Sequence, residues 1–306
     1  MLFRRNDDPE ELSFITEGPI LMSLVKLAWP IMLSQLMQTL YNLVDTLWVG
    51  RVGASAVAAI SISFPLVFLL ISIAAGLTIA GTAIIAQYKG GGHLREANRV
   101  MGQMFSFIGL LSIIIGVVGF IFARNMIIMM GAEPRIVNDA TGYIRVIFMG
   151  MPFMFGFFIF SSVLRGIGDT VTPAVMMFVS VVLNMILDPL LIFGIGFFPE
   201  LGVQGAAVAT IFSRAVVAVL AVFMLIKGVG ELRLRIYDLR PNFNIIKLIA
   251  RIGIPSSVEQ SMISLGQLFM TVLVTSFGTM TLAAYGIVNR VVSLPVILAF
   301  GLAASA

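Results

Sequence analysis

Long apolar segments recur along almost the whole chain, and they constrain its fold more than any other feature. Only 11% of the 306 residues are charged, against about 25% in soluble domains. Runs of about twenty or more mainly apolar residues are the signature of membrane-spanning helices. Such runs fit at residues 24–49, 56–86, 99–122, 137–164, 172–195, 203–227, 247–276 and 281–306. The sequence therefore predicts an all-α polytopic membrane protein with eight spans.

The basic residues indicate how these spans are oriented. Thirteen lysines and arginines fall in segments on the side of the N-terminus, and four fall on the opposite side. Because short cytoplasmic loops carry the excess of positive charge, we expect a cytoplasmic N-terminus and a location in the plasma or inner membrane. The same clustering explains the pI of about 9.7 without nucleic acid as a partner. The lack of cysteine and the single histidine exclude disulfides and a multi-histidine metal centre. No loop is long enough for an active site, so we expect no enzyme.

An internal repeat divides the chain into lobes. Residues 30–81 align without gaps with residues 255–306 and share sixteen identities, among them Pro30 with Pro255. Six predicted spans separate the two copies, so both begin on the same side of the membrane, which is a parallel repeat of the kind found in transporters. We expect a cytoplasmic segment at 1–23, a six-helix N-lobe at 24–227, a cytoplasmic linker at 228–246, and the first two helices of a C-lobe at 247–306. The last span ends with the chain, so we expect the C-lobe to be truncated.

The first span carries a polar stripe. Gln35, Gln38, Asn42 and Asp45 recur at spacings of three and four residues, which places them on one narrow arc of a helix, bordered by Tyr41. The seventh span repeats the stripe with Gln260, Ser264, Gln267 and Thr271, but it has Met270 in the place of Asp45. Gln38, Asn42, Gln260 and Gln267 are candidates for lining a substrate cavity, and hydrogen bonding between helices is the alternative. Asp45 is a candidate for a cation path unless it is solvated near the outer interface.

The fifth span holds a second acid beside a proline. Asn184 and Asp188 are four residues apart and therefore share one face of the helix. Pro189 lacks an N–H and frees the carbonyl of Met185, and Pro30 is a second candidate for bending a helix. Carboxylate, amide and carbonyl oxygens suit a proton or a hard cation. The alternative is an acid solvated in a vestibule of a bent helix.

Two arginines, Arg214 and Arg290, lie within the sixth and eighth spans. They are candidate counter-charges for the acids, although a long basic side chain can also extend to the membrane interface. Neither of them lies on the polar stripe of Asp45.

Five segments resemble the multidrug and toxic compound extrusion (MATE) transporters, and they occur in the order of the family: WPIMLSQLMQTLYNLVDTLWVGRVG, QYKGGGHLREANR, RGIGDTVTP, NMILDPLLIFG and GVQGAAVAT. The acid in the first span together with Asn-x-x-x-Asp-Pro is similar to the DinF-like branch. The resemblance implies twelve spans in two lobes around a central cleft, and alternating access. It implies export of cationic amphipathic compounds in exchange for H⁺ or Na⁺, without a cofactor, by a monomer in the lipid bilayer.

The resemblance also implies a cation site in the N-lobe. The matching positions are Asp45, Asn184 and Asp188, together with Tyr143 and Thr210. Asp45, Asn184, Asp188 and Thr210 would hold Na⁺. Two other functions stay open at this point. A flippase for lipid-linked precursors has the same architecture but is expected to carry cationic residues in its cavity. The second open possibility is a truncated membrane protein that does not transport.

Overall fold

The computed structural model describes residues 20–275 together with residues 288 and 292. The eighth predicted span and Arg290 therefore lie outside the described part, apart from two single positions. Within residues 20–275 the elements are helices, with one isolated β-bridge between Val229 and Leu232. They are α2 (Ile20–Val52), α3 (Ala54–Gly90), α4 (Leu94–Met129), α5 (Val137–Met149), α6 (Met151–Gly166), α7 (Val171–Phe193), α8 (Val203–Lys227), the short 3₁₀ helix η1 (Ile236–Leu239) and α9 (Phe243–Thr275).

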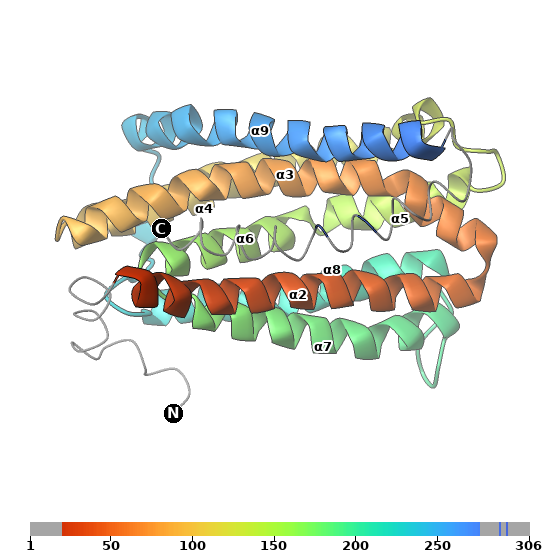
Figure 1. The fold of residues 1–306 in the computed structure, drawn as a ribbon, viewed down its shortest axis with the longest axis horizontal. Coiled ribbons are helices and arrows are strands. Elements are labelled where there is room, and N and C mark those ends of the chain that lie inside the picture. Colours follow the sequence, from red (N-terminus) through yellow and green to blue (C-terminus); the bar gives the residue numbers. More distant parts are fainter. Residues whose placement is uncertain (1–19, 276–287, 289–291, 293–306) are drawn as a thin grey trace.

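The long helices run side by side along the longest axis of the molecule (Figure 1). α2 packs against α7, and α9 packs against α3 on the other side of the bundle. α8 contacts α7 and also α5 and α6, so it links the α2–α7 pair to the rest of the bundle. α2 and α9, which carry the two copies of the predicted stripe, do not contact each other within the described residues.

The described helices confirm an all-α membrane protein. By length and composition, α3, α4, α7 and α8 can each cross a membrane, and the bent pair α5–α6 adds a fifth span. α2 and α9 coincide with the first and seventh predicted spans. In the described part of the chain, neither helix is apolar enough along its length to be counted as a membrane span by composition. The polar stripes on these two helices account for this difference. α2 to α8, with α5 and α6 taken together, match the first six predicted spans.

The fourth span is broken, and the prediction of one continuous helix over 137–164 was wrong. α5 and α6 meet at Gly150 and are bent by 48°. Pro152 stands at the start of α6, where a missing N–H costs nothing, and it does not continue the hydrogen bonds of α5. A Cβ at Gly150 would overlap the side chain of Ile211. The break therefore forms where a glycine lets α8 approach closely and a proline begins a new helix.

Small residues join α9 to α3. A Cβ at Gly76 would overlap the backbone of Ser257, whose Oγ donates to the carbonyl of Ile73 at 3.1 Å. The hydroxyl oxygens of Ser72 and Ser264 are 2.9 Å apart and share a hydrogen bond. Glycine and serine let membrane helices approach and bond to each other. Ser264, a member of the predicted stripe, is thus used for packing against α3.

The linker between α8 and α9 is held on α4. The Gln103 side chain is buried, and its Nε2 donates to the carbonyls of Asp238 and Arg240 at 2.8 and 2.7 Å. The N–H of Asn242 donates back to Gln103 Oε1 at 2.8 Å. The Ser106 hydroxyl donates to the carbonyl of Leu239 at 2.7 Å. One buried amide and one hydroxyl therefore fix the position of η1.

Candidate functional site

Asn184 and Asp188 form a buried pair on α7. Both residues are 0% exposed, and Asn184 Nδ2 donates to Asp188 Oδ1 at 2.9 Å. Asn184 Oδ1 and Asp188 Oδ2 are also buried but accept no hydrogen bond from the residues that the structure describes. Pro189 follows inside the same helix, so the Met185 carbonyl loses the N–H that would normally bond to it. In this conformation the pair is enclosed by the helices and is not solvated.

Asp45 approaches this pair from α2. α2 packs along α7, and Asp45 lies near enough to Asp188 for their charges to interact. Asp45 Oδ1 is buried and accepts no hydrogen bond within the described part of the chain. Two helices therefore present three oxygens without donors: Asp45 Oδ1, Asn184 Oδ1 and Asp188 Oδ2.

Two tyrosines and a threonine surround the acids. Tyr41 Oη donates to Thr210 Oγ1 on α8 at 2.5 Å. Tyr143 of α5 is buried near Tyr41 and both acids. The structure thus brings Tyr143 and Thr210 to the same region as the acids, and their part in a cation site stays a prediction. Sequence reasoning placed Tyr41 only at the border of the stripe, although its position four residues before Asp45 puts it on the same face.

Arg214 of α8 lies in the interior and is only 8% exposed. Its Nη2 donates to Gln38 Oε1 at 2.7 Å, and its Nη1 contacts Met177 Sδ at 3.1 Å. The guanidinium carbon lies 5.3 Å from the centre of the Phe157 ring and 5.7 Å from that of Tyr41. Among the described residues Arg214 forms no salt bridge. The sequence placed Arg214 away from the stripe of Asp45, but the fold joins it to that stripe through Gln38.

The predicted cavity residues fall into two separate groups. Gln38 Nε2 donates to Asn42 Oδ1 at 3.2 Å on α2, and the Asn42 side chain is exposed. Gln260 and Gln267 lie on α9, which α3 separates from α2 (Figure 1). α2 runs through Pro30 as one helix, and the Ser34 hydroxyl donates to the Pro30 carbonyl at 2.8 Å. The side chain of Thr271 lies outside the described residues.

A comparison with protein families decides the class of the chain. The family model described as MatE matches residues 30–190, which is more than half of the sequence and includes Asp45, Asn184 and Asp188. The chain belongs to the MatE family.

This MatE chain is similar to curated proteins and to solved structures. "Probable multidrug resistance protein YoeA" of Bacillus subtilis (strain 168) is 35% identical over 269 residues, which are 86% of this chain and 58% of the relative. "FAD transporter" of Shewanella oneidensis is 29% identical over 292 residues, which are 95% of this chain and 64% of the relative. The solved structure "Outward-facing conformation of a multidrug resistance MATE family transporter of the MOP superfamily" matches with a TM-score of 0.84 and 28% identity. That match covers 95% of this chain and 65% of the solved one. The MatE chain thus spans less than two thirds of the length of these proteins.

Proposed function

We propose that the protein is a secondary antiporter that exports cationic amphipathic compounds in exchange for H⁺ or Na⁺. The observation that carries the proposal is the group of three buried oxygens without donors, Asp45 Oδ1, Asn184 Oδ1 and Asp188 Oδ2. A buried acceptor without a partner costs about 1–3 kcal/mol, and more if it is charged. Acids inside a membrane protein therefore mark ion pathways. A bound proton or cation would offset this cost.

The chemistry of the oxygens supports a proton or a monovalent cation. Carboxylate, amide and hydroxyl oxygens are ligands for hard cations, and Asp45, Asn184, Asp188 and Thr210 would hold Na⁺. Within the described residues, no cluster of three or more His, Cys, Asp or Glu side chains could hold a metal ion in the way a multi-carboxylate or multi-histidine site does. Two carboxylates close to each other repel unless a positive charge lies between them or one is protonated. The cation site would lie in the N-lobe, residues 24–227, with the N-terminus in the cytoplasm.

Coupling would follow from competition for the same two acids. A cation loaded from outside would join Asp45 on α2 to Asp188 on α7 and so change how these two helices pack. Pro30 and Pro189 interrupt the backbone hydrogen bonds of these helices and would let them bend. A cationic substrate near Asn42 and Gln38 would lose its attraction to the acids once they are neutralised. Such a ligand-dependent shift between two conformations is sufficient for alternating access.

The substitution Asp188→Asn tests the proposal. The protein is reconstituted in proteoliposomes, and export of a fluorescent cationic dye is measured under a proton gradient and, separately, under a sodium gradient. We expect Asp188→Asn to abolish gradient-driven export and to leave helix content and elution volume unchanged, because asparagine can still accept the bond from Asn184. Asp139→Asn, the same change at the start of α5, is the matched control and should keep export. Unchanged export by Asp188→Asn contradicts the proposal.

Arg214 favours a second function. A buried guanidinium without an acidic partner in the described residues would suit an anionic substrate, such as a lipid-linked precursor. Flipping of a labelled anionic lipid is therefore measured in the same vesicles. Movement of lipid but not dye, lost in Arg214→Gln, would support a flippase. Movement of neither compound would support a protein that does not transport.

A further inference from the structure

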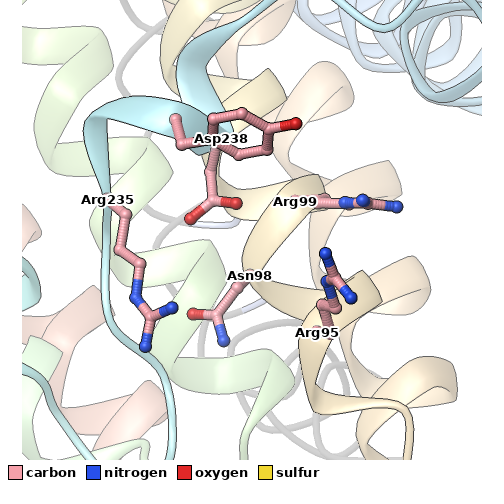
Figure 2. Close-up of a pocket in the computed structure, with 6 residues that line it drawn as sticks. Arg95, Asn98, Arg99, Arg235 and Asp238 are labelled. Carbon is pink, nitrogen blue, oxygen red and sulfur yellow. The ribbon is translucent and has the colours of Figure 1, made fainter.

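A cavity of about 520 Å³ lies between the start of α4 and the linker that precedes α9. Six residues line it: Arg95, Asn98, Arg99, Arg235, Tyr237 and Asp238. Figure 2 shows Arg95, Asn98 and Arg99 on α4, and Arg235 and Asp238 on the linker. Asn98 lies between Arg235 and α4, whereas the side chain of Arg99 extends away from the linker. The cavity is far from the acids of the candidate cation site in sequence and shares no lining residue with them.

The lining of this cavity carries unbalanced positive charge. It holds three arginines against one aspartate, a net charge of +2. In the described part of the chain, none of the three arginine side chains forms a salt bridge or donates a hydrogen bond. Arg95 and Arg99 are four residues apart on one face of α4, close to the positive end of the helix dipole, where cations are disfavoured. Glu96 is the single acid of that first turn. An anion bound in the cavity would offset the repulsion among the three arginines and between Arg95, Arg99 and the helix dipole.

The two walls of the cavity are fixed to each other. Asn98 Oδ1 accepts the N–H of Arg233 at 2.7 Å, which ties the beginning of the linker to α4. Gln103 and Ser106 hold the carbonyls of residues 238–240 further along the same helix. The arginines of α4 and Arg235 therefore stay on opposite sides of one space. The fold builds this arrangement through several specific hydrogen bonds.

The length and charge of α4 indicate where the cavity lies relative to the membrane. α4 has 36 residues and is about 54 Å long, whereas the hydrocarbon layer is only about 30 Å thick. Because its first turns carry Arg95, Glu96 and Arg99, we infer that this end of α4 extends beyond the hydrocarbon. The same linker and the first residue of α9 also expose large apolar side chains: Ile236 is 88% exposed, Tyr237 61% and Phe243 82%. Such side chains beside basic residues are typical of a segment that lies in the membrane interface.

We propose that this cavity binds the phosphate headgroup of an anionic phospholipid from the leaflet that the linker faces. Arg95, Arg99 and Arg235 would contact the phosphodiester, since a guanidinium donates paired hydrogen bonds to phosphate oxygens. Basic pockets between membrane helices bind anionic headgroups in this way. Ile236, Tyr237 and Phe243 would lie among the acyl chains and headgroups around it. The bound lipid would connect α4 of the N-lobe to the linker that leads into α9.

Native mass spectrometry tests the proposal without depending on transport. The protein is released from bilayer discs of mixed phosphatidylglycerol and phosphatidylcholine, and the retained lipids are counted. We expect phosphatidylglycerol to be enriched. The triple variant Arg95→Gln, Arg99→Gln, Arg235→Gln should lower its affinity by about tenfold or more, and Arg99→Gln alone by about fivefold. The control carries the same loss of charge near the opposite helix ends, through Arg51→Gln, Arg124→Gln and Arg135→Gln, and should keep the enrichment.

Three results would overturn the proposal. The first is equal enrichment in the cavity triple and the control triple, with helix content unchanged by circular dichroism. The second is no enrichment in the unchanged protein. The third is arginine-dependent binding of inorganic phosphate to the protein in detergent without lipid enrichment, which would assign the cavity to a free phosphate anion. The double variant Ile236→Ser, Phe243→Ser keeps all three arginines and is expected to weaken lipid retention. Binding of a free phosphate anion would not depend on these apolar side chains, so this loss is specific to a lipid ligand.

Discussion

Replacing both Asn184 and Asp188 by leucine should stabilise the protein, although it removes a buried hydrogen bond. The pair leaves Asn184 Oδ1 and Asp188 Oδ2 buried without donors. Two such acceptors cost about 2–6 kcal/mol together, whereas the one bond between the side chains contributes about 1.5–3 kcal/mol because its acceptor is ionisable. Leucine has the same number and branching of heavy atoms as both residues, and it removes both the unpaired acceptors and the hydrogen bond. We expect the double variant to unfold with a free energy about 1–3 kcal/mol higher than that of the unchanged protein.

The single substitution should act in the opposite direction. Asn184→Leu removes the only hydrogen bond that the described residues donate to the Asp188 carboxylate, so the free energy of unfolding should fall by about 1.5–3 kcal/mol. Reversible unfolding is followed by circular dichroism as SDS is added to protein in mixed micelles. Ile186→Leu, on the exposed face of the same helix, is the control and should change little. The expected order of stability is the double variant, then the unchanged protein, then Asn184→Leu.

Sodium adds an independent check to the same measurement. A ligand that binds only the folded state at one hundred times its dissociation constant adds about 2.7 kcal/mol to the free energy of unfolding. If Na⁺ is the coupling ion, the unchanged protein should gain this stability, and the double variant should not respond. A double variant less stable than the unchanged protein would refute the reasoning, because it would show that the two side chains stabilise the helix bundle more than their unpaired oxygens weaken it.

Two further substitutions test the packing of α9 and of the linker. Gly76→Ala places a Cβ on the backbone of Ser257 and should lower the free energy of unfolding by about 1–3 kcal/mol in the same SDS titration. Gly109→Ala, whose Cβ meets no neighbour, should not lower it. Equal effects of the two substitutions would contradict the close contact of α3 and α9. Gln103→Leu leaves three backbone groups of the linker without partners and should accelerate trypsin cleavage within residues 233–240. The exposed control Gln87→Leu should be cleaved like the unchanged protein. Unchanged cleavage of Gln103→Leu would mean that other contacts hold η1.

Local sequence determined where the helices lie and which residues share a face. The apolar runs predicted seven of the described helical regions to within several residues, because a backbone in lipid must form its hydrogen bonds internally. The spacing of four residues between Asn184 and Asp188 predicted their common face, and the structure shows the hydrogen bond between them. Pro189 likewise falls inside the helix where the sequence placed it. Each of these features depends only on helical periodicity, which is a property of neighbouring residues.

Contacts between helices were decided by the tertiary structure alone. Tyr41 meets Thr210 across 169 positions, Arg214 meets Gln38 across 176, and the linker closes a basic cavity with α4 across 135 or more. The break at Gly150 also depends on a neighbour, since Ile211 of α8 occupies the space that a side chain would need. An apolar helix in lipid can rotate and shift with little change in its exposure to solvent, so its sequence specifies neither its rotation nor its depth. Only the packing of small residues and the pairing of buried polar groups against other helices select one arrangement.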